Sequence, residues 1–261
     1  MTLDGRVAIV TGASRGIGEY IAKHLARGGA QVVVAARTEQ ATDPRLPGTI
    51  HSVAQAITDA GHKAVPLRMD MRDPDSIRAG VAATVEQFGR LDIIVNNAAI
   101  LVPGDLDTVL ERHIELMWQI DLRGPILLCK AALPHMRAGG GGDIINLSSA
   151  AAIFPGPGPY TDAGIGGLFY GMVKAGLERF TQGLAMNVQA DKIKANVLSL
   201  KYQIRTPGNI FAQNDPANPR LDFDDADWMG RAARYICEQP ATYTGHIVYD
   251  DDIRDRLQQY V

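Results

Sequence analysis

The sequence predicts an α/β fold in which helices flank a parallel sheet of about seven strands. Three observations support this: short apolar runs rich in β-branched residues recur along the chain, longer helical patterns separate them, and a glycine-rich turn follows the first run. The runs are continuously apolar rather than alternating, which is typical of strands covered on both faces. Strands that alternate with helices imply right-handed βαβ units and hence a parallel, doubly wound sheet.

The predicted elements follow one another without an internal repeat or a clear linker, so we expect a single domain over residues 1–261. The strand runs are Val7–Val10, Val32–Ala35, Ala64–Leu67, Ile93–Val95, Ile144–Leu147, Ala195–Leu198 and His246–Tyr249. The helical stretches include Gly16–Arg27, Ser52–Ala60, Pro74–Phe88 and Asp107–Met136, the last with an expected break near Arg123-Gly124-Pro125. Asp73 before Pro74 is a favourable helix start, because an acidic cap precedes a proline in the first turn.

Three segments rich in proline, glycine or polar residues are predicted to be loops: 38–49, 154–167 and 209–227. Loops of this length inside a compact domain are often functional, and a plain surface insertion is the alternative. We expect the second and third to border a substrate site.

Composition excludes several classes of protein. The chain is 46% hydrophobic and 21% charged, which argues against disorder, and its net charge of −3 argues against a nucleic-acid binder. No apolar stretch approaches the roughly 18 residues of a membrane span, and the N-terminus has no signal-peptide pattern. Cys129 and Cys237 lack metal-ligand spacing, so we expect no metal site and buried thiols in a cytoplasmic enzyme or small-molecule binder.

A glycine-rich turn with the sequence TGASRGIG links the first predicted strand to the first helix. Glycines let a backbone approach a pyrophosphate, and the helix N-terminus offers N–H groups and a positive dipole end. An ordinary glycine-rich turn is the alternative, since the pattern alone is a weak signal. Its place after the first strand favours a dinucleotide site, and the residues expected to bind there are Gly12, Ser14, Arg15, Gly16, Ile17 and Gly18.

The end of the second strand predicts NADP(H) rather than NAD(H). An acidic residue there would bind the ribose hydroxyls, whereas this chain has Ala36 followed by Arg37. Arg15 in the glycine turn supplies a second guanidinium, and two such groups favour a 2′-phosphate through charge-assisted bonds. The alternative is that both arginines are solvated surface residues.

Tyr170 and Lys174 are four residues apart, which places a phenol and an ammonium on one face of a helix. A lysine cation favours the phenolate, so such a tyrosine can exchange a proton with a substrate oxygen near neutral pH. Ser148 and Ser149 close the fifth strand run, at the edge of the sheet where ligands bind in open α/β folds. Either serine is placed to hold that oxygen.

Taken in order, five motifs resemble those of the short-chain dehydrogenase/reductase family over nearly the whole chain: TGASRGIG, Asp70 after the third strand, NNAA, INLSS and YGMVK. The resemblance implies a Rossmann-type sheet and hydride transfer between a nicotinamide cofactor and a carbonyl or alcohol. It implies that Tyr170 is the general acid/base, that Lys174 binds the nicotinamide ribose and tunes Tyr170, and that Ser149 steadies the substrate oxygen.

The resemblance also implies further cofactor contacts. Asp70 and Met71 would lie at the adenine, Asn96 beside the adenine ribose with Asn97 and Ala98 in the same motif, and Thr206 at the nicotinamide carboxamide with Ile204 near it. The stretch 43–50 and the ending 244–252 resemble a subgroup described as hydroxysteroid dehydrogenase-like. Family members are commonly homodimers or homotetramers.

The chain departs from the family pattern at three places. Asp121 stands where the family often has an asparagine that supports a water relay to the lysine. If ionised near Lys174, Asp121 would partly cancel the lysine's effect on Tyr170, which implies an altered, higher pH optimum. Ser149 and Tyr170 lie 21 positions apart, farther than in many members, and Leu200-Lys201 replaces the usual proline–glycine pair.

The leading hypothesis is therefore an NADP(H)-dependent oxidoreductase acting on a carbonyl or secondary alcohol. Apolar residues would line a hydrophobic pocket or else pack in the core: Ile153, Phe154, Leu168, Phe169 and Phe211. The alternative is a non-catalytic or weakly active NADP(H)-binding regulatory protein of the same fold. The intact serine, tyrosine and lysine argue against that alternative.

Overall fold

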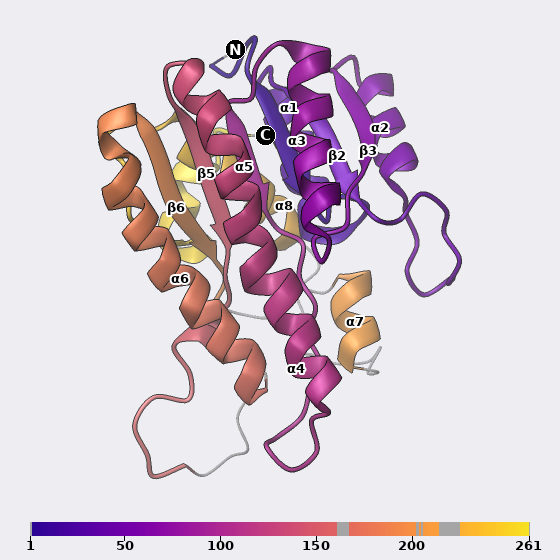
Figure 1. The fold of residues 1–261 in the computed structure, drawn as a ribbon, viewed down its shortest axis with the longest axis vertical. Helices are drawn as coiled ribbons and strands as arrows, with labels where there is room; N and C mark the ends of the chain where they lie inside the picture. The colour runs from indigo at the N-terminus through magenta and orange to yellow at the C-terminus, as the bar shows by residue number, and fades with distance from the viewer. Residues whose placement is uncertain (1, 161–166, 202–203, 205, 214–224, 261) are drawn as a thin grey trace.

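A seven-stranded sheet forms the centre of the molecule (Figure 1). The computed structural model describes residues 2–160, 167–201, 204, 206–213 and 225–260. All strands are parallel, in the order β3-β2-β1-β4-β5-β6-β7, which confirms the predicted doubly wound α/β fold. The strands are β1 (Val7–Thr11), β2 (Gln31–Ala36), β3 (Ala64–Arg68), β4 (Ile93–Asn96), β5 (Gly142–Leu147), β6 (Ile193–Ser199) and β7 (Ile247–Tyr249).

The core lies on both faces of this sheet, because successive side chains of each strand point to opposite faces. Ala8 and Val10 belong to one apolar cluster, which includes residues of α1 (Gly16–Arg27), α2 (Ile50–Asp59) and α8 (Asp225–Glu238). Ile9 between them belongs to the other, with residues of α3 (Pro74–Phe88) and α5 (Gly124–Ala138). Burial on both faces explains why the strand runs are continuously apolar.

Local capping sets where α2 and α3 begin. The Asp73 side chain accepts from the backbone N–H of Asp75 at 2.9 Å, so α3 starts at Pro74 as predicted. The Thr49 and Ser52 side chains each accept from the other's backbone N–H, and this capping box starts α2 at Ile50, two residues before the predicted start.

The fourth predicted helix differs from the expectation in two ways. It begins as α4 (Glu111–Met117) rather than at Asp107, and it passes through a π-helical segment, η1 (Trp118–Arg123), into α5. The expected break near Gly124-Pro125 is therefore wrong. Pro125 lies in the first turn of α5, where the missing N–H costs little, and the wider π-helical turns precede it.

The last third of the chain carries α6 (Leu168–Val188), α7 (Pro207–Gln213) and short helical turns. The prediction of a loop over 209–227 is wrong at both ends, since α7 includes residues 209–213 and α8 starts at Asp225. Residues 214–224 and 161–166 of the predicted loops lie outside the described residues. The short turns are η2 (Ala150–Ala152), η3 (Gln189–Asp191), η4 (Asp250–Ile253) and α9 (Arg254–Leu257).

Strand order positions the site. The chain runs outward from β1 through β2 to β3, then returns to place β4 on the other side of β1. Ligands in open α/β sheets bind at the carboxyl ends of the strands beside such a reversal. Among the described residues, no helix has the length and apolarity needed to cross a membrane, and no cluster of His, Cys, Asp and Glu suits a metal ion.

Replacement of Ile94 by alanine tests the central packing. Ile94 in β4 is fully buried, so Ile94→Ala is expected to cost about 2–5 kcal/mol in the free energy of unfolding, measured by urea denaturation. Val65→Ala in the edge strand β3, where the side chain is half-buried, is the control. Equal losses in the two variants would contradict the placement of the core around β4.

Candidate active site

The glycine turn after β1 packs directly against the end of β4. Gly12 has φ +65°, and a Cβ there would lie 2.7 Å from the Cα of Ala98. A Cβ on Gly18 would lie 2.4 Å from Asn97 Nδ2. These contacts leave no room for a side chain, so both positions require glycine.

Asn97 and Ala98 hold the turn in place. Asn97 Nδ2 donates to the carbonyl oxygens of Thr11 at 2.8 Å and Gly12 at 3.2 Å, and Thr11 Oγ1 accepts from the backbone N–H groups of Asn97 and Ala98. The neighbouring Asn96 is buried, and its Nδ2 donates to Asn146 Oδ1 at 2.8 Å. The amide nitrogen of Asn96 is therefore already bonded to β5.

The start of α1 suits a phosphate group. Arg15 occupies the N-cap in an extended conformation, and none of the described side chains caps the helix there. The first-turn N–H groups, which include those of Ile17 and Gly18, and the positive end of the helix dipole therefore point out of the turn. Ser14 beside them is buried, and Gly16 adopts φ +61°. The turn fits the pyrophosphate of a dinucleotide.

The segment 43–48 lies against this turn. Arg15 Nε donates to the Pro47 carbonyl at 2.9 Å and Arg15 Nη2 to the Gly48 carbonyl at 3.1 Å. A Cβ on Gly48, which has φ +92°, would lie 2.4 Å from the Ser14 carbonyl oxygen. Burial lowers the pKa of Arg15. Part of the Arg15 guanidinium is thus already bound within the protein, which the sequence did not indicate.

Arg37 and Asp70 lie at the carboxyl ends of β2 and β3. Arg37 is exposed. Arg72 binds the Asp70 carboxylate with Nε at 3.0 Å and Nη2 at 2.6 Å; these bonds lower the pKa of Asp70, and the charge of Arg37 adds to the effect. Met71 is buried in the core cluster on the α3 and α5 face. The carboxyl ends of β2 and β3 therefore present the exposed Arg37 guanidinium beside the paired Asp70 carboxylate.

Thr206 lies against the glycine turn. A Cβ on Gly16 would lie 3.2 Å from Thr206 Cβ, so Thr206 is in contact with the glycine turn. Ile204 is buried, and its carbonyl accepts from the Thr206 N–H at 2.9 Å. The structure thus places Thr206 at the turn with Ile204 bonded to it, while their contact with the nicotinamide stays a prediction.

The start of α6 packs closely on η2, which brings Tyr170 to Ser149. A Cβ on Gly171 would lie 2.6 Å from the Ala151 carbonyl oxygen, so glycine permits this contact. Ser149 caps η2, its Oγ accepting from the Ala151 N–H at 3.3 Å. The Ser149 side chain lies beside the Tyr170 phenol and favours its phenolate. The predicted catalytic serine and tyrosine therefore meet.

Lys174 and Asp121 form a buried ion pair next to Tyr170. Lys174 Nζ lies 3.3 Å from Asp121 Oδ1 and 5.4 Å from the centre of the Tyr170 ring. It donates to the Leu147 carbonyl at 3.0 Å, while Asp121 Oδ2 accepts from the Ile100 N–H at 3.1 Å. The π-helical segment η1 carries Asp121 to this position, and π-turns are frequent at functional sites.

Burial dominates the protonation of the cluster. It raises the pKa of Asp121 to about 6, although Lys174 favours the carboxylate. Burial also raises the pKa of Tyr170; Lys174 opposes that effect, Asp121 adds to it, and Ser149 favours the phenolate. For Lys174, burial disfavours the ammonium, but Tyr170 and Asp121 outweigh it and the pKa is raised. The expected influence of Lys174 on the phenol is therefore present but smaller than that of burial.

The apolar residues proposed to line a pocket are not in the core. Four of them are between 43% and 62% exposed: Ile153, Phe154, Leu168 and Phe211. Phe169 is half-buried. In α7, the Phe211 ring lies 4.6 Å from the Arg45 guanidinium of segment 43–48. These residues therefore form exposed apolar surface on η2, α6 and α7.

Two other features were missed by the sequence analysis or left without an account. Glu178 on α6 is buried and accepts from Ser148 Oγ at 2.6 Å; its i+4 spacing from Lys174 was the available signal. Lys201 pairs with Asp252 and lies 5.6 Å from the Tyr249 ring.

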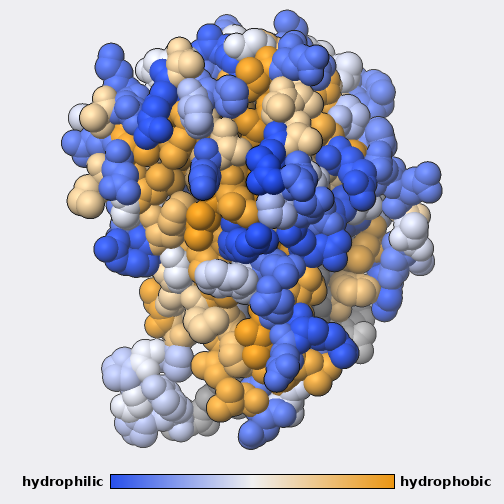
Figure 2. Space-filling model, viewed as in Figure 1, coloured by the Kyte–Doolittle hydropathy of each residue, from blue (hydrophilic) through white to orange (hydrophobic). Residues whose placement is uncertain are grey.

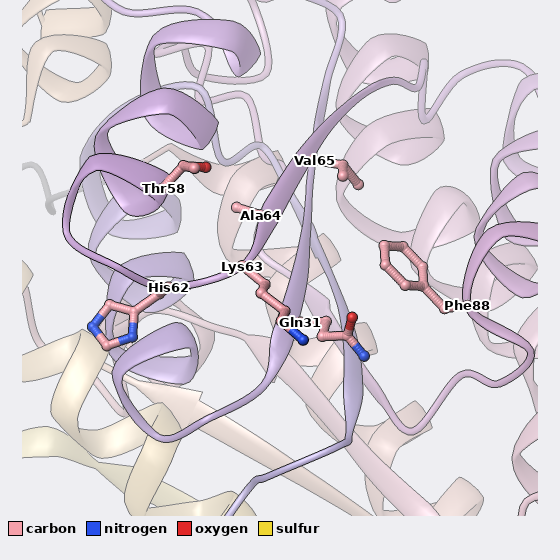
Figure 3. A pocket seen from close by; sticks show the side chains of 7 residues that line it. All are labelled: Gln31, Thr58, His62, Lys63, Ala64, Val65 and Phe88. Atoms are coloured by element: carbon pink, nitrogen blue, oxygen red, sulfur yellow. The ribbon is translucent and has the colours of Figure 1, made fainter.

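A separate hollow of about 300 Å³ lies at the opposite edge of the sheet (Figure 3). It lies at the amino ends of β2 and β3, away from the glycine turn, and is lined by Gln31, Thr58, His62, Lys63, Ala64, Val65 and Phe88. It contains none of the residues of the cluster around Tyr170.

Comparison with known proteins agrees with this geometry. A family model described as short chain dehydrogenase matches residues 6–212. Hydroxysteroid dehydrogenase-like protein 2 from Bos taurus is 34% identical over 252 residues, and that from Danio rerio is 36% identical. Each match covers 96% of this chain but 58% of the relative. The chain therefore spans less than two thirds of the length of these relatives.

Solved structures of similar fold include a short-chain dehydrogenase and a short-chain oxidoreductase. One from Mycobacterium thermoresistibile has a TM-score of 0.84 and 32% identity, covering 98% of this chain and 88% of that one. A metagenomic short-chain oxidoreductase solved in complex with NADP has a TM-score of 0.74 and 27% identity, covering 95% and 99%. From the family model, which matches most of the chain, and these relatives, this protein belongs to the short-chain dehydrogenase family.

Proposed function

We propose that the protein is an NADP(H)-dependent oxidoreductase that transfers a hydride between nicotinamide and a carbonyl or secondary alcohol. The observation that carries this proposal is the meeting of Ser149, Tyr170 and Lys174 at the carboxyl edge of the sheet, next to the glycine turn. A proton donor and an anion-binding turn at one edge suit the reduction of a carbonyl by a dinucleotide. Family membership supports an oxidoreductase.

In the reductive direction, the Tyr170 phenol would donate its proton to the substrate oxygen. A nicotinamide held at the glycine turn would supply the hydride. The Ser149 hydroxyl donates a hydrogen bond to the same oxygen and holds it beside Tyr170. Lys174, fixed by Leu147 and Asp121, stabilises the phenolate that remains. Oxidation of an alcohol reverses these steps, with the Tyr170 phenolate as the base.

Cofactor choice depends on the adenosine end of the groove. Arg37 is exposed at the end of β2, and its charge already acts on Asp70. We propose that Arg37 binds the 2′-phosphate of NADP(H), and that Arg15 adds positive charge while it holds segment 43–48. The similar metagenomic oxidoreductase in complex with NADP supports this choice.

The surroundings favour an apolar substrate and a homo-oligomer. The exposed apolar side chains on η2, α6 and α7 suit a hydrophobic substrate. Exposed apolar side chains on or beside α4, η1 and α6 include Leu110, Trp118 and Met172. Apolar surface is also exposed over α5 and the lower parts of α4 and α6 (Figure 2). We propose that a second copy covers it, giving a homodimer or homotetramer.

Cys129 and Cys237 are free and buried, as suits a cytoplasmic protein.

The second candidate function is an NADP(H)-binding protein without turnover. The feature that favours it is the Asp121 carboxylate, which opposes formation of the Tyr170 phenolate. The complete set of Ser149, Tyr170 and Lys174 favours the enzyme instead.

Replacing Tyr170 distinguishes the two functions. Tyr170→Phe removes the proton donor and is expected to lower kcat by about 100-fold or more, while the Kd for NADPH changes by less than about threefold. Steady-state kinetics and NADPH fluorescence titration measure the two effects. Tyr160→Phe, at an exposed phenol bonded to the Gly156 carbonyl, is the control. Unchanged turnover in Tyr170→Phe would support the non-catalytic function.

The charge of Asp121 sets the expected pH dependence. Because its pKa is about 6, Asp121 is ionised at neutral pH and raises the pKa of Tyr170. Asp121→Asn removes that charge and so lowers the pKa of the Tyr170 phenol. In the pH–rate profile of alcohol oxidation, the rise in rate that accompanies phenolate formation should occur about one pH unit lower. Below about pH 6 the Asp121 carboxyl of the wild type is protonated and uncharged. The profiles of the wild type and of Asp121→Asn should therefore coincide there. A pH–rate profile identical to that of the wild type would contradict this role.

Arg37 provides the test of cofactor choice. Arg37→Ala is expected to raise the Kd for NADPH about tenfold or more and to leave the Kd for NADH nearly unchanged, since only NADPH carries the 2′-phosphate. Arg78→Ala, at an exposed arginine paired with Asp75 on α3, is the matched control. Equal weakening of both cofactors, or of neither, would exclude Arg37 as the phosphate ligand.

A further inference from the structure

We propose that Glu178 is a positioning residue of the Tyr170–Lys174 centre, one that fixes Ser148 beside Ser149 and acts as a second carboxylate on Lys174. This inference rests on the proposed function, because it assigns Glu178 a part in that same site. Neither the family motifs nor the sequence analysis points to this residue.

The helix geometry brings Glu178 into the centre. Tyr170, Lys174 and Glu178 follow one another at intervals of four residues on α6, so they lie along one face of the helix. Glu178 is 7% exposed and Lys174 2% exposed. A carboxylate this deep in a protein is costly unless it is paired or hydrogen-bonded.

Ser148 supplies the hydrogen bond. Its Oγ donates to Glu178 Oε1 at 2.6 Å, and its backbone N–H donates to the Leu198 carbonyl of β6 at 2.9 Å. Consecutive side chains of an extended chain point in opposite directions, and Ser149 is extended, with φ −156° and ψ 153°. A fixed Ser148 side chain therefore directs the Ser149 hydroxyl toward the phenol.

Charge provides the second part of the argument. Burial raises the pKa of Glu178, while the Ser148 hydrogen bond and the Lys174 ammonium lower it. Lys174 thus pairs with Asp121 on η1 at 3.3 Å, and the charge of Glu178 one turn further along α6 also raises the pKa of Lys174. Among the described residues, Tyr249 of β7 also faces Glu178, whose charge raises the pKa of Tyr249, and its ring lies 5.6 Å from Lys201. The negative charges of Asp121 and Glu178 offset part of the positive charge of Lys174. The ammonium therefore stabilises the Tyr170 phenolate less, and the pKa of the phenol is higher.

The variant Glu178→Gln separates charge from contact. The amide oxygen still accepts from Ser148, but the negative charge is gone, so the Tyr170 phenol should titrate about half a unit to one unit lower. Ultraviolet difference titration measures this, with the same chain carrying Tyr170→Phe as the reference. The readout needs neither cofactor nor substrate, so its outcome is independent of whether the protein turns over.

Two further variants complete the test. Ser148→Ala keeps the charge and removes the contact: the phenol titration should stay in place while kcat falls about three- to tenfold. Asp191→Asn, which removes a charge just past the end of α6, should change neither. A Tyr170 titration in Glu178→Gln that matches the Asp191→Asn control would overturn the proposal. An equal shift in Ser148→Ala would overturn it as well, by showing that the contact alone is responsible.

The outcomes also separate this proposal from the proposed function. A shifted Tyr170 titration in a protein that shows no turnover would support the influence of Glu178 on the phenol. The same result would contradict the proposed oxidoreductase function. Should Glu178→Gln fail to fold, Ser148→Ala decides: a kcat within twofold of the wild type would overturn the positioning role.

Discussion

The buried contact between Lys174 and Asp121 is the constraint on which the rest of the site depends. An ammonium this deep is costly unless it is paired, and here it donates to the Leu147 carbonyl and pairs with the Asp121 carboxylate. The contact ties α6 to β5 and to the π-helical segment η1. Tyr170 lies one turn earlier on α6, so the same contact fixes its position. The contact also fixes α6 against the carboxyl end of β5, where a dinucleotide would bind.

The phosphate side of the groove depends on close packing rather than charge. Gly12 and Gly18 let the turn touch the end of β4, and Asn97 holds it there. On the outer side, segment 43–48 binds Arg15 and reaches α7 through Arg45 and Phe211. The glycine turn therefore lies between the end of β4 on one side and, on the other, segment 43–48, which itself contacts α7.

Features encoded in short stretches were predictable from the sequence. The seven strands follow from apolar runs, the α3 start from Asp73-Pro74, and the meeting of Tyr170 with Lys174 from helical spacing. The π-helical segment was not predictable, because it depends on how α4 and α5 pack, and neither were the bonds of Arg15 to segment 43–48. Asp121 was placed near Lys174 only through the family resemblance, and Glu178 was missed because its partner Ser148 lies 30 residues away.

The most direct test of the account is the titration of the Tyr170 phenol with and without saturating NADP⁺. If the cationic nicotinamide ring lies against Tyr170, its charge should lower the pKa of the phenol, seen as an ultraviolet difference signal that Tyr170→Phe abolishes. A phenol that titrates at the same pH while NADP⁺ is bound would contradict the account, because the cofactor would then lie away from the Tyr170–Lys174 centre.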